Sequence, residues 1–150
     1  MSKKAPKISE MKLKHFTYPD RFGEWLGYQL IKGDRKNLIA EAGLKIREDH
    51  LSPAKRVHGG VISAFLDYVC GAAVFLTLRP KDFCSTVELK VNYLLPIELG
   101  DQLRATAQIV FRGRRLCVLQ SFVYRNGSKQ PVAMASATYN VVVSKEIANG

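Results

Sequence analysis

A long apolar stretch at residues 61–78 constrains the fold of this chain more than any other feature. It reads VISAFLDYVCGAAVFLTL and is apolar on nearly every helical face, which predicts a helix buried on all sides. His58-Gly59-Gly60 precedes it and offers backbone N–H groups where the helix would begin. Its one charged residue is Asp67. A lone carboxylate there is costly unless it has a partner or faces a cleft, so Asp67 is the first candidate for function.

Three interpretations of this stretch are open. It has about the length of a membrane span, but the central charge and the soluble-type alternation elsewhere disfavour membrane insertion. Asp67 could be a structural carboxylate that caps a neighbouring loop. The functional interpretation is a carboxylate in a mostly dry pocket, suited to act as a base or a nucleophile.

Composition narrows the class of protein. The 150 residues are expected to form one domain, and 47% hydrophobic residues suffice for a core. The net charge of +10 favours anionic partners: nucleic acid, acidic lipid or a phosphate-bearing ligand. Cys70, Cys84 and Cys117 form no C-x-x-C pair, which favours reduced thiols in a cytoplasmic protein, and no signal peptide is visible. Cys70 is better interpreted as a small buried hydrophobe than as a second nucleophile.

The first 25 residues differ from the remainder. Residues 1–25 are predicted to be a basic, partly flexible arm with an aromatic segment, and residues 26–146 the folded domain. We expect the aromatic side chains to dock on the core or to line a pocket; they are Phe16, Tyr18, Phe22 and Trp25. Pro19 and Gly23 argue against a long helix here.

Apolar and polar residues alternate in six further segments, which predicts six strands. Two precede the helix, at 26–32 and 37–47, and four follow it, at 85–95, 103–111, 116–125 and 131–143. Asn126-Gly127 is a strong hairpin signal. The order β-β-α-β-β-β-β predicts an α+β domain. Four consecutive hairpin-linked strands would form an antiparallel sheet wrapped around the one long helix.

This order, with His58-Gly59-Gly60 and Asp67 on the central helix, resembles the hotdog fold. More narrowly, it resembles the PaaI-type acyl-CoA thioesterases of the phenylacetate pathway, over about residues 38–143. The matching pieces are Ser52-Pro53-Ala54, His58-Gly59-Gly60, Asp67, Ser85-Thr86, Asn92-Tyr93-Leu94-Leu95-Pro96 and Gly100-Asp101. Each piece is a modest signal, and their common order and spacing make the resemblance specific.

The resemblance implies an acyl-CoA thioesterase that hydrolyses a thioester to a carboxylate and free CoA. Asp67 would be the general base or nucleophile, and the Gly60 backbone N–H would polarise the thioester carbonyl. Gly59 would lie beside it, and His58 would hold the turn. The chemistry fits, since preorganised N–H donors at a helix N-terminus stabilise developing negative charge.

Two positions of the resemblance need comment. The hydroxyl that orients the water falls on Thr86 by the strand pattern or on Ser85 by counting from Asp67, and both remain open. The family commonly has an asparagine where this chain has Ser52, whose hydroxyl cannot copy the paired donor and acceptor of an amide. We expect this change to affect either full activity or the usual substrate.

The spacing of Gly60 and Asp67 bears on the assembly. Seven residues are about 10 Å along a helix, so one carbonyl carbon can hardly lie about 3 Å from both. Two antiparallel helices across a two-fold axis would bring the Gly-Gly turn of one chain to Asp67 of the other. The spacing therefore favours a homodimer with shared sites. The resemblance implies the same and extends to tetramers.

Coenzyme A is expected as part of the substrate, and no separate cofactor is expected. Its phosphates could meet Arg112, Arg114 and Arg115 at a strand turn, which otherwise form a solvated hairpin. Tyr68 either lines a pocket for the acyl group or belongs to the core.

Other classes are disfavoured by missing motifs. No basic recognition helix or RNA-type aromatic signature accompanies the positive charge, and the three histidines lack metal-ligand spacing. Neither a P-loop, nor G-x-G-x-x-G, nor G-x-S-x-G occurs. Two rivals stay open on the same fold. One is a non-catalytic acyl-CoA binding or sensing protein, which Ser52 suggests, and the other is a dehydratase of hydroxyacyl thioesters that recruits His58.

Overall fold

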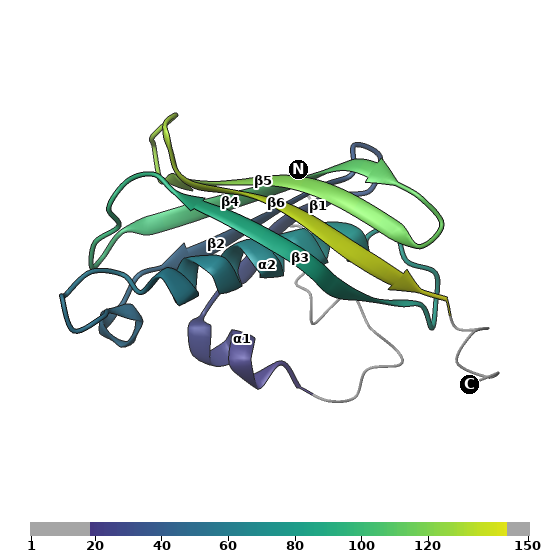
Figure 1. The fold of residues 1–150 in the computed structure, drawn as a ribbon. Helices are drawn as coiled ribbons and strands as arrows, with labels where there is room; N and C mark the ends of the chain where they lie inside the picture. Colours follow the sequence, from purple (N-terminus) through teal and green to yellow (C-terminus); the bar gives the residue numbers. More distant parts are fainter. Residues whose placement is uncertain (1–18, 144–150) are drawn as a thin grey trace, which may run out of the picture.

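The computed structural model describes residues 19–143, in which a six-stranded antiparallel sheet curves over one long helix (Figure 1). The elements in chain order are α1 (Arg21–Leu26), β1 (Gln29–Asp34), β2 (Ile39–Lys45), the 3₁₀ turn η1 (Glu48–His50), α2 (Gly59–Phe75), β3 (Phe83–Tyr93), β4 (Gln102–Arg112), β5 (Leu116–Arg125) and β6 (Pro131–Val142). The sheet is open, and the predicted α+β hotdog fold is confirmed. Most of the predicted arm, with Phe16 and Tyr18, lies outside the described residues.

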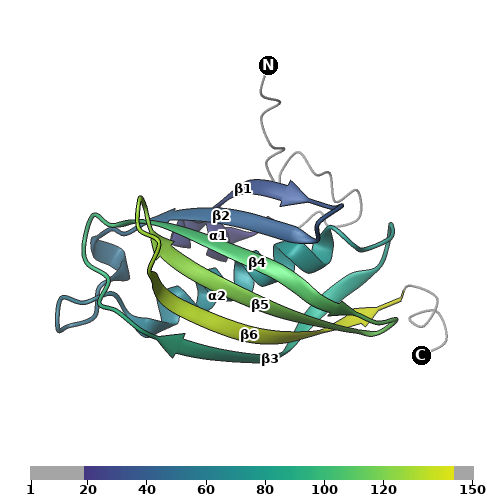
Figure 2. The ribbon, with the colours of Figure 1, turned by 90° about the horizontal axis from the view of Figure 1, so that it is seen from above.

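Figure 2 shows the strands in the order β1-β2-β4-β5-β6-β3. β4, β5 and β6 are neighbours joined by hairpins, but β3 pairs with β6 and not with β4. The prediction that all four strands after the helix are linked by hairpins was therefore wrong for β3. The loop 94–101 has to pass two strands, about 14 Å, and its extended length of about 26 Å is sufficient. β3 thereby becomes an edge of the sheet.

Small side chains on the inner face of the sheet let α2 approach closely. The buried positions of β2, β4 and β6 hold seven alanines: Ala40, Ala42, Ala105, Ala107, Ala133, Ala135 and Ala137. Phe65 and Leu66 of α2 are completely buried, and Phe65 is the largest such side chain. The helix thus supplies the bulk of this part of the core, and the sheet supplies the room for it.

The helix ends earlier than its apolar pattern predicts. α2 ends at Phe75, and the N–H groups of Thr77 and Leu78 turn back to carbonyls three residues earlier. Within residues 19–143, no helix has the length and apolar character that crossing a membrane requires.

One side of α2 is only partly covered by the sheet. Its members are partly or fully exposed: Gly60, Ser63, Ala64, Asp67 and Gly71. Their spacing of three and four residues places them on one side of the helix. The prediction of a helix buried on all sides was therefore wrong for this stripe, which the sheet of one chain covers only in part.

The aromatic segment before β1 forms the short helix α1. Asp20 caps it by accepting the Gly23 N–H at 2.9 Å. α1 buries Leu26, whereas Phe22 and Trp25 are 57% and 52% exposed. Within this chain these two aromatics do not dock on the core, because the side of α1 that meets the core carries Leu26. The alternative, that they line a pocket, stays a prediction.

Buried His50 ties together three segments ahead of α2. Its Nε2 donates to the Leu26 carbonyl at 2.9 Å, and its Nδ1 accepts the Arg47 N–H at 3.2 Å. Its own carbonyl accepts the His58 N–H at 2.8 Å. Burial, followed by the nearby Arg47 guanidinium, lowers the pKa of His50 below its ordinary value. His50 is thus a neutral structural group.

This burial predicts a loss of stability in mild acid. Below the ordinary histidine pKa of 6.5, the unfolded chain binds a proton at His50 that the folded chain still excludes, so falling pH favours unfolding. The slope from this group is at most about 1.4 kcal/mol per pH unit. His50→Gln, which can still donate to Leu26, should flatten the decline in melting temperature between about pH 6.5 and 5. An equal decline in both proteins would contradict the assignment.

Candidate functional site

The carboxylate of Asp67, on the partly exposed stripe of α2, is held by two hydroxyl groups. Thr86 of β3 donates to Oδ1 at 2.7 Å, and Tyr139 of β6 donates to the same oxygen at 2.5 Å. The Tyr139 hydroxyl also lies 2.7 Å from the Asp67 main-chain oxygen. Within residues 19–143, Oδ2 accepts no hydrogen bond and Asp67 forms no ion pair. The half-buried carboxylate therefore has one fixed and one available oxygen.

The register of β3 and β6 separates the two candidate hydroxyls. Thr86 is the Cα partner of Tyr139, and Ser85 is the partner of Asn140. Since successive side chains of a strand point to opposite faces, Thr86 and Tyr139 face α2 while Ser85 faces away. The structure thus brings Thr86, and not Ser85, to Asp67.

Tyr139 is the residue at this site that the sequence analysis missed. It is 72 positions from Asp67, so no local spacing connects the two. One signal was present: the inward row of β6 reads Ala133, Ala135, Ala137 and then Tyr139. A single large polar side chain in a row of small ones that faces the helix indicates a specific hydrogen-bond partner on that helix.

His58 caps the N-terminus of α2. Its Nδ1 accepts the Gly60 N–H at 3.0 Å, so the imidazole carries no proton on Nδ1. A Cβ at position 60 would lie 3.2 Å from Nδ1, a tight contact that a small shift of the His58 ring would relieve. The N–H to which the family resemblance gives the oxyanion role is therefore occupied by His58 in this structure. An oxyanion would have to take the place of this nitrogen.

Tyr93 closes the other side of the same turn. Its hydroxyl donates to the Gly59 carbonyl at 3.1 Å and lies 2.5 Å from the Ser63 hydroxyl. A Cβ at position 59 would lie 3.3 Å from the Tyr93 ring. Gly59 thus allows the end of β3 to contact the start of α2.

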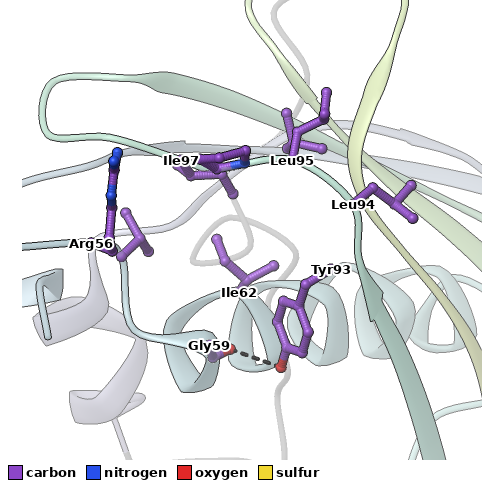
Figure 3. A pocket seen from close by; sticks show the side chains of 10 residues that line it. Arg56, Gly59, Ile62, Tyr93, Leu94, Leu95 and Ile97 are labelled. Atoms are coloured by element: carbon purple, nitrogen blue, oxygen red, sulfur yellow. Dashed lines mark hydrogen bonds between the residues drawn. The ribbon is translucent and has the colours of Figure 1, made fainter. Parts of the chain in front are cut away.

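A groove of about 490 Å³ opens beside this turn (Figure 3). Its volume lies in the range of small-molecule sites. The groove is lined mostly by apolar side chains. The complete lining is Arg56, Val57, Gly59, Ile62, Tyr93, Leu94, Leu95, Pro96, Ile97 and Val132. The groove reaches Gly59 but not Asp67 of the same chain.

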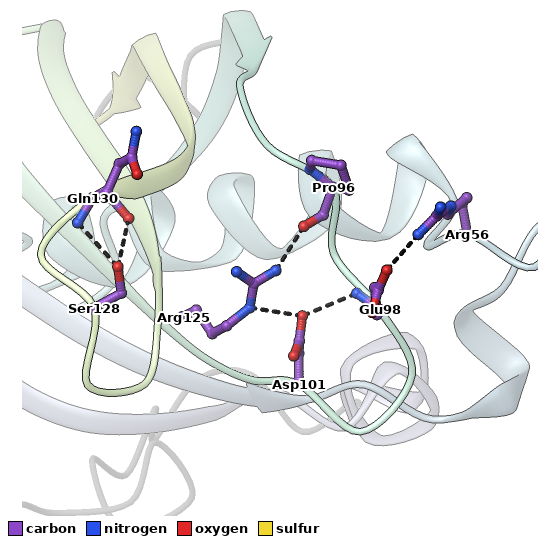
Figure 4. Close-up of polar contacts among 7 residues, drawn as sticks. All are labelled: Arg56, Pro96, Glu98, Asp101, Arg125, Ser128 and Gln130. Atoms are coloured by element: carbon purple, nitrogen blue, oxygen red, sulfur yellow. Dashed lines mark hydrogen bonds and ion pairs between the residues drawn. The ribbon is translucent and has the colours of Figure 1, made fainter.

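The loop between β3 and β4, which forms one wall of the groove, is fixed by a polar network (Figure 4). Arg125 donates to Asp101 Oδ2 at 2.9 Å and to the Pro96 carbonyl at 2.6 Å. Asp101 also accepts the Glu98 N–H at 2.9 Å, and Glu98 pairs with Arg56 at 2.5 Å. The network joins the groove wall to β5 and to the loop before α2, so the groove is preformed.

Two other predicted substrate contacts lie elsewhere. The main chain of Ser52 closes a tight loop, donating to the Arg56 carbonyl at 2.7 Å and accepting the Lys55 N–H at 2.8 Å. Tyr68 stacks on Tyr28 with ring centroids 3.7 Å apart, and burial raises its pKa to about 12. Neither Ser52 nor Tyr68 lines the groove.

The basic turn lies at the other end of α2. Arg112 donates to the Thr77 hydroxyl at 2.9 Å and to the Gly113 carbonyl, while Arg114 and Arg115 are exposed. About 24 Å of helix separates this end from Gly59. One chain therefore does not bring the three arginines to the Gly-Gly turn.

The described residues contain no group of three or more acidic, histidine or cysteine side chains placed to hold a metal ion. Cys70, Cys84 and Cys117 are free thiols, as the sequence predicts. Burial raises the pKa of Cys70 to about 12, which makes it a poor nucleophile.

Two curated proteins are similar to part of this chain. F42H10.6 of Caenorhabditis elegans is 34% identical over 82 residues, 55% of this chain and 47% of that protein. Mouse acyl-coenzyme A thioesterase 13 is 28% identical over 87 residues, 58% of this chain and 60% of that protein. The matched stretches thus span about half to three-fifths of these relatives.

The structural similarity extends further along the chain. The phenylacetic acid degradation-related protein of Ralstonia eutropha JMP134 superposes with a TM-score of 0.78 at 29% identity, covering 89% of this chain and 98% of that one. The resemblance to phenylacetate-pathway proteins is thereby confirmed. The family model of the thioesterase superfamily matches residues 54–132, from the loop before α2 to the start of β6. As this match spans more than half of the chain and includes the Gly-Gly turn, Asp67 and Thr86, the chain belongs to the thioesterase superfamily.

Proposed function

We propose that this chain is an acyl-CoA thioesterase that uses Asp67 as its general base. The observation that carries the proposal is the state of this carboxylate: Oδ1 is fixed by two hydroxyls and Oδ2 is available, on the partly exposed side of the central helix. Membership of the thioesterase superfamily and similarity to an acyl-coenzyme A thioesterase support the substrate class.

In the proposed reaction a water molecule attacks the thioester carbonyl carbon while Asp67 Oδ2 takes its proton. The carbonyl electron pair moves to oxygen and forms an oxyanion. The Gly60 N–H gives up its hydrogen bond to His58 Nδ1 and donates to this oxyanion instead, which stabilises it. When the intermediate collapses, the C–S bond breaks and the proton passes from Asp67 to the CoA thiolate. The products are a carboxylate, after ionisation of the acid, and free CoA. In a variant of this scheme, Asp67 Oδ2 itself attacks the thioester carbonyl carbon and forms an anhydride intermediate.

The proposed site is shared by two copies. In one chain the groove at Gly59 does not reach Asp67, and the stripe of α2 that carries Asp67 is only partly covered. Edge strand β3 carries Thr86 and pairs with β6 only. Antiparallel pairing of two β3 edges about a two-fold axis would cover both stripes and bring the glycine turn of one copy toward Asp67 of the other. The proposal extends to a tetramer formed by two such dimers.

The same two-fold axis would bring the basic turn of one chain close to the groove of the other. It would reverse the direction of α2 in the second copy, so Arg112, Arg114 and Arg115 of one chain approach the groove of the other. There they would meet the phosphates of coenzyme A. The reaction as proposed uses only side chains, backbone N–H groups and water, and needs no metal or redox cofactor.

A hydrolysis screen tests the function. Acyl-CoAs that differ in chain length and aromatic character are incubated with the protein, and released CoA thiol is measured with DTNB. We expect turnover with at least one class, at a kcat of about 1 s⁻¹ or higher. Tight acyl-CoA binding by calorimetry without thiol release would indicate a binding protein. Enoyl absorbance from a 3-hydroxyacyl-CoA would indicate a dehydratase.

A further inference from the structure

We infer that Tyr139 is a positioning residue for the hydrolytic reaction: its hydroxyl, with that of Thr86, holds Asp67 Oδ1 so that Oδ2 is presented to the attacking water. The inference rests on the proposed function. It assigns a role to a residue of the last strand for which no sequence motif provides one. Tyr139 does not touch the substrate in this scheme and acts through Asp67.

The geometry restrains the carboxylate from two strands. Thr86 reaches Oδ1 from β3, and Tyr139 reaches the same atom from β6, at 2.7 and 2.5 Å. The two residues are register partners, so the pairing of β3 with β6 sets the distance between the donors. An O–H donor to a carboxylate at this distance forms a strong, charge-assisted hydrogen bond. Two such bonds on one oxygen fix the rotation of the side chain and leave Oδ2 free.

Tyr139 is well suited to remain a donor. It is only 3% exposed, and its ring packs against Gly71, where a Cβ would lie 3.7 Å from the hydroxyl. Burial, followed by the hydrogen bond to Asp67, raises the pKa of Tyr139 far above its ordinary value. The hydroxyl therefore keeps its proton throughout the pH range of any assay.

The surroundings supply no other charge to hold Asp67. The titratable groups that face it are Tyr28 ahead of β1, Cys70 on α2, Cys84 on β3 and Tyr139 on β6. Burial raises the pKa of every one of them, so all four are neutral near neutral pH. Within residues 19–143, the charge of Asp67 is stabilised by the two hydroxyls and not by a cation. Removing one donor therefore leaves the carboxylate with one charge-assisted hydrogen bond fewer.

Tyr139→Phe tests the inference, since it removes the hydroxyl and keeps the ring. The acidic limb of the pH profile of kcat/KM should move up by about one pH unit, because a hydrogen bond to a charged group contributes about that much. kcat at the optimum should fall about 10–100-fold with KM within about twofold. Thr86→Val should shift the limb in the same direction. Tyr124→Phe, on β5, is the matched control and should change neither.

A second measurement does not depend on activity. Asp67 is observed by ¹³C NMR of its carboxyl carbon, assigned with Asp67→Asn, and titrated in the original and Tyr139→Phe proteins. A higher titration midpoint in the variant supports the inference. An unchanged midpoint and an unchanged acidic limb in an active, folded variant would overturn it while leaving the thioesterase proposal intact. A raised midpoint in a chain that hydrolyses no acyl-CoA would overturn the proposed function, and with it the catalytic meaning of Tyr139.

Discussion

Asp67→Asn is expected to lower kcat for acyl-CoA hydrolysis by about 10³-fold, the usual contribution of a general base. The amide oxygen of asparagine can still accept hydrogen bonds from Thr86 and Tyr139, so the local structure should persist. What the amide cannot do is take a proton from water. The loss should therefore appear in kcat, and the melting temperature and the oligomeric state should stay close to those of the original protein.

The control for this variant is Asp49→Asn, which neutralises an exposed carboxylate on η1 that pairs with Arg47 at the surface. It should leave turnover unchanged. Asp67→Ala also removes the acceptor of both hydroxyls, and we expect it to abolish turnover and to reduce stability. Undiminished hydrolysis across the acyl-CoA panel by Asp67→Asn would remove this residue from the mechanism.

The second large effect is expected from Val87→Lys on the edge strand. Val87 is 61% exposed and lies in the bulge of β3, between Thr86 and Glu88. A lysine on an edge strand opposes pairing with a second strand, most of all with a copy of itself. If two copies share their sites, the variant should sediment as a monomer and lose hydrolysis by about 100-fold or more.

Val110→Lys is a matched control, because Val110 is 67% exposed and occupies the bulge of the interior strand β4. Because β4 lies between β2 and β5 and not at an edge of the sheet, assembly and turnover should be retained. A Val87→Lys protein that stays dimeric and active would contradict pairing through β3. A monomer with full activity would contradict a shared site.

Mixing two inactive variants distinguishes a shared site from a site within one chain. Asp67→Asn lacks the base, and Gly60→Pro lacks the N–H donor at a helix position where proline is tolerated. In a mixed dimer, one of the two shared sites would combine an intact Asp67 with an intact Gly60. Random exchange of subunits should then restore about a quarter of the original activity. No recovery would place both groups in the same chain.

Because His58 Nδ1 accepts the Gly60 N–H in this structure, the proposed reaction requires that this hydrogen bond breaks before the N–H can bind the oxyanion. His58 Nδ1 holds this donor in the absence of substrate, at the place where negative charge would develop. The imidazole thus satisfies a helix N-terminus that would otherwise be uncapped. Replacing one acceptor of the Gly60 N–H by another costs less free energy than leaving this N–H without an acceptor. The turn can therefore be preorganised for the oxyanion and still be stable.

Much of the fold could be predicted from local patterns. The hairpins β4–β5 and β5–β6 follow from strict alternation and from Asn126-Gly127, and the central helix from its unbroken apolar run. Asp67 stood out because a charge in such a run needs a reason. These features depend on neighbours in the chain, where periodicity directly reports which face is buried.

The remaining features depend on which distant segments meet. Local alternation is the same whether β3 pairs with β4 or crosses to β6, so the sequence could not place it. The choice between Thr86 and Ser85 required the register of β3 on β6, and Tyr139 required the same register from the other strand. The sequence by itself determined the acid and the helix that carries it. Only the tertiary structure decided which side chains hold that acid, because sheet register is set by the packing of the whole core.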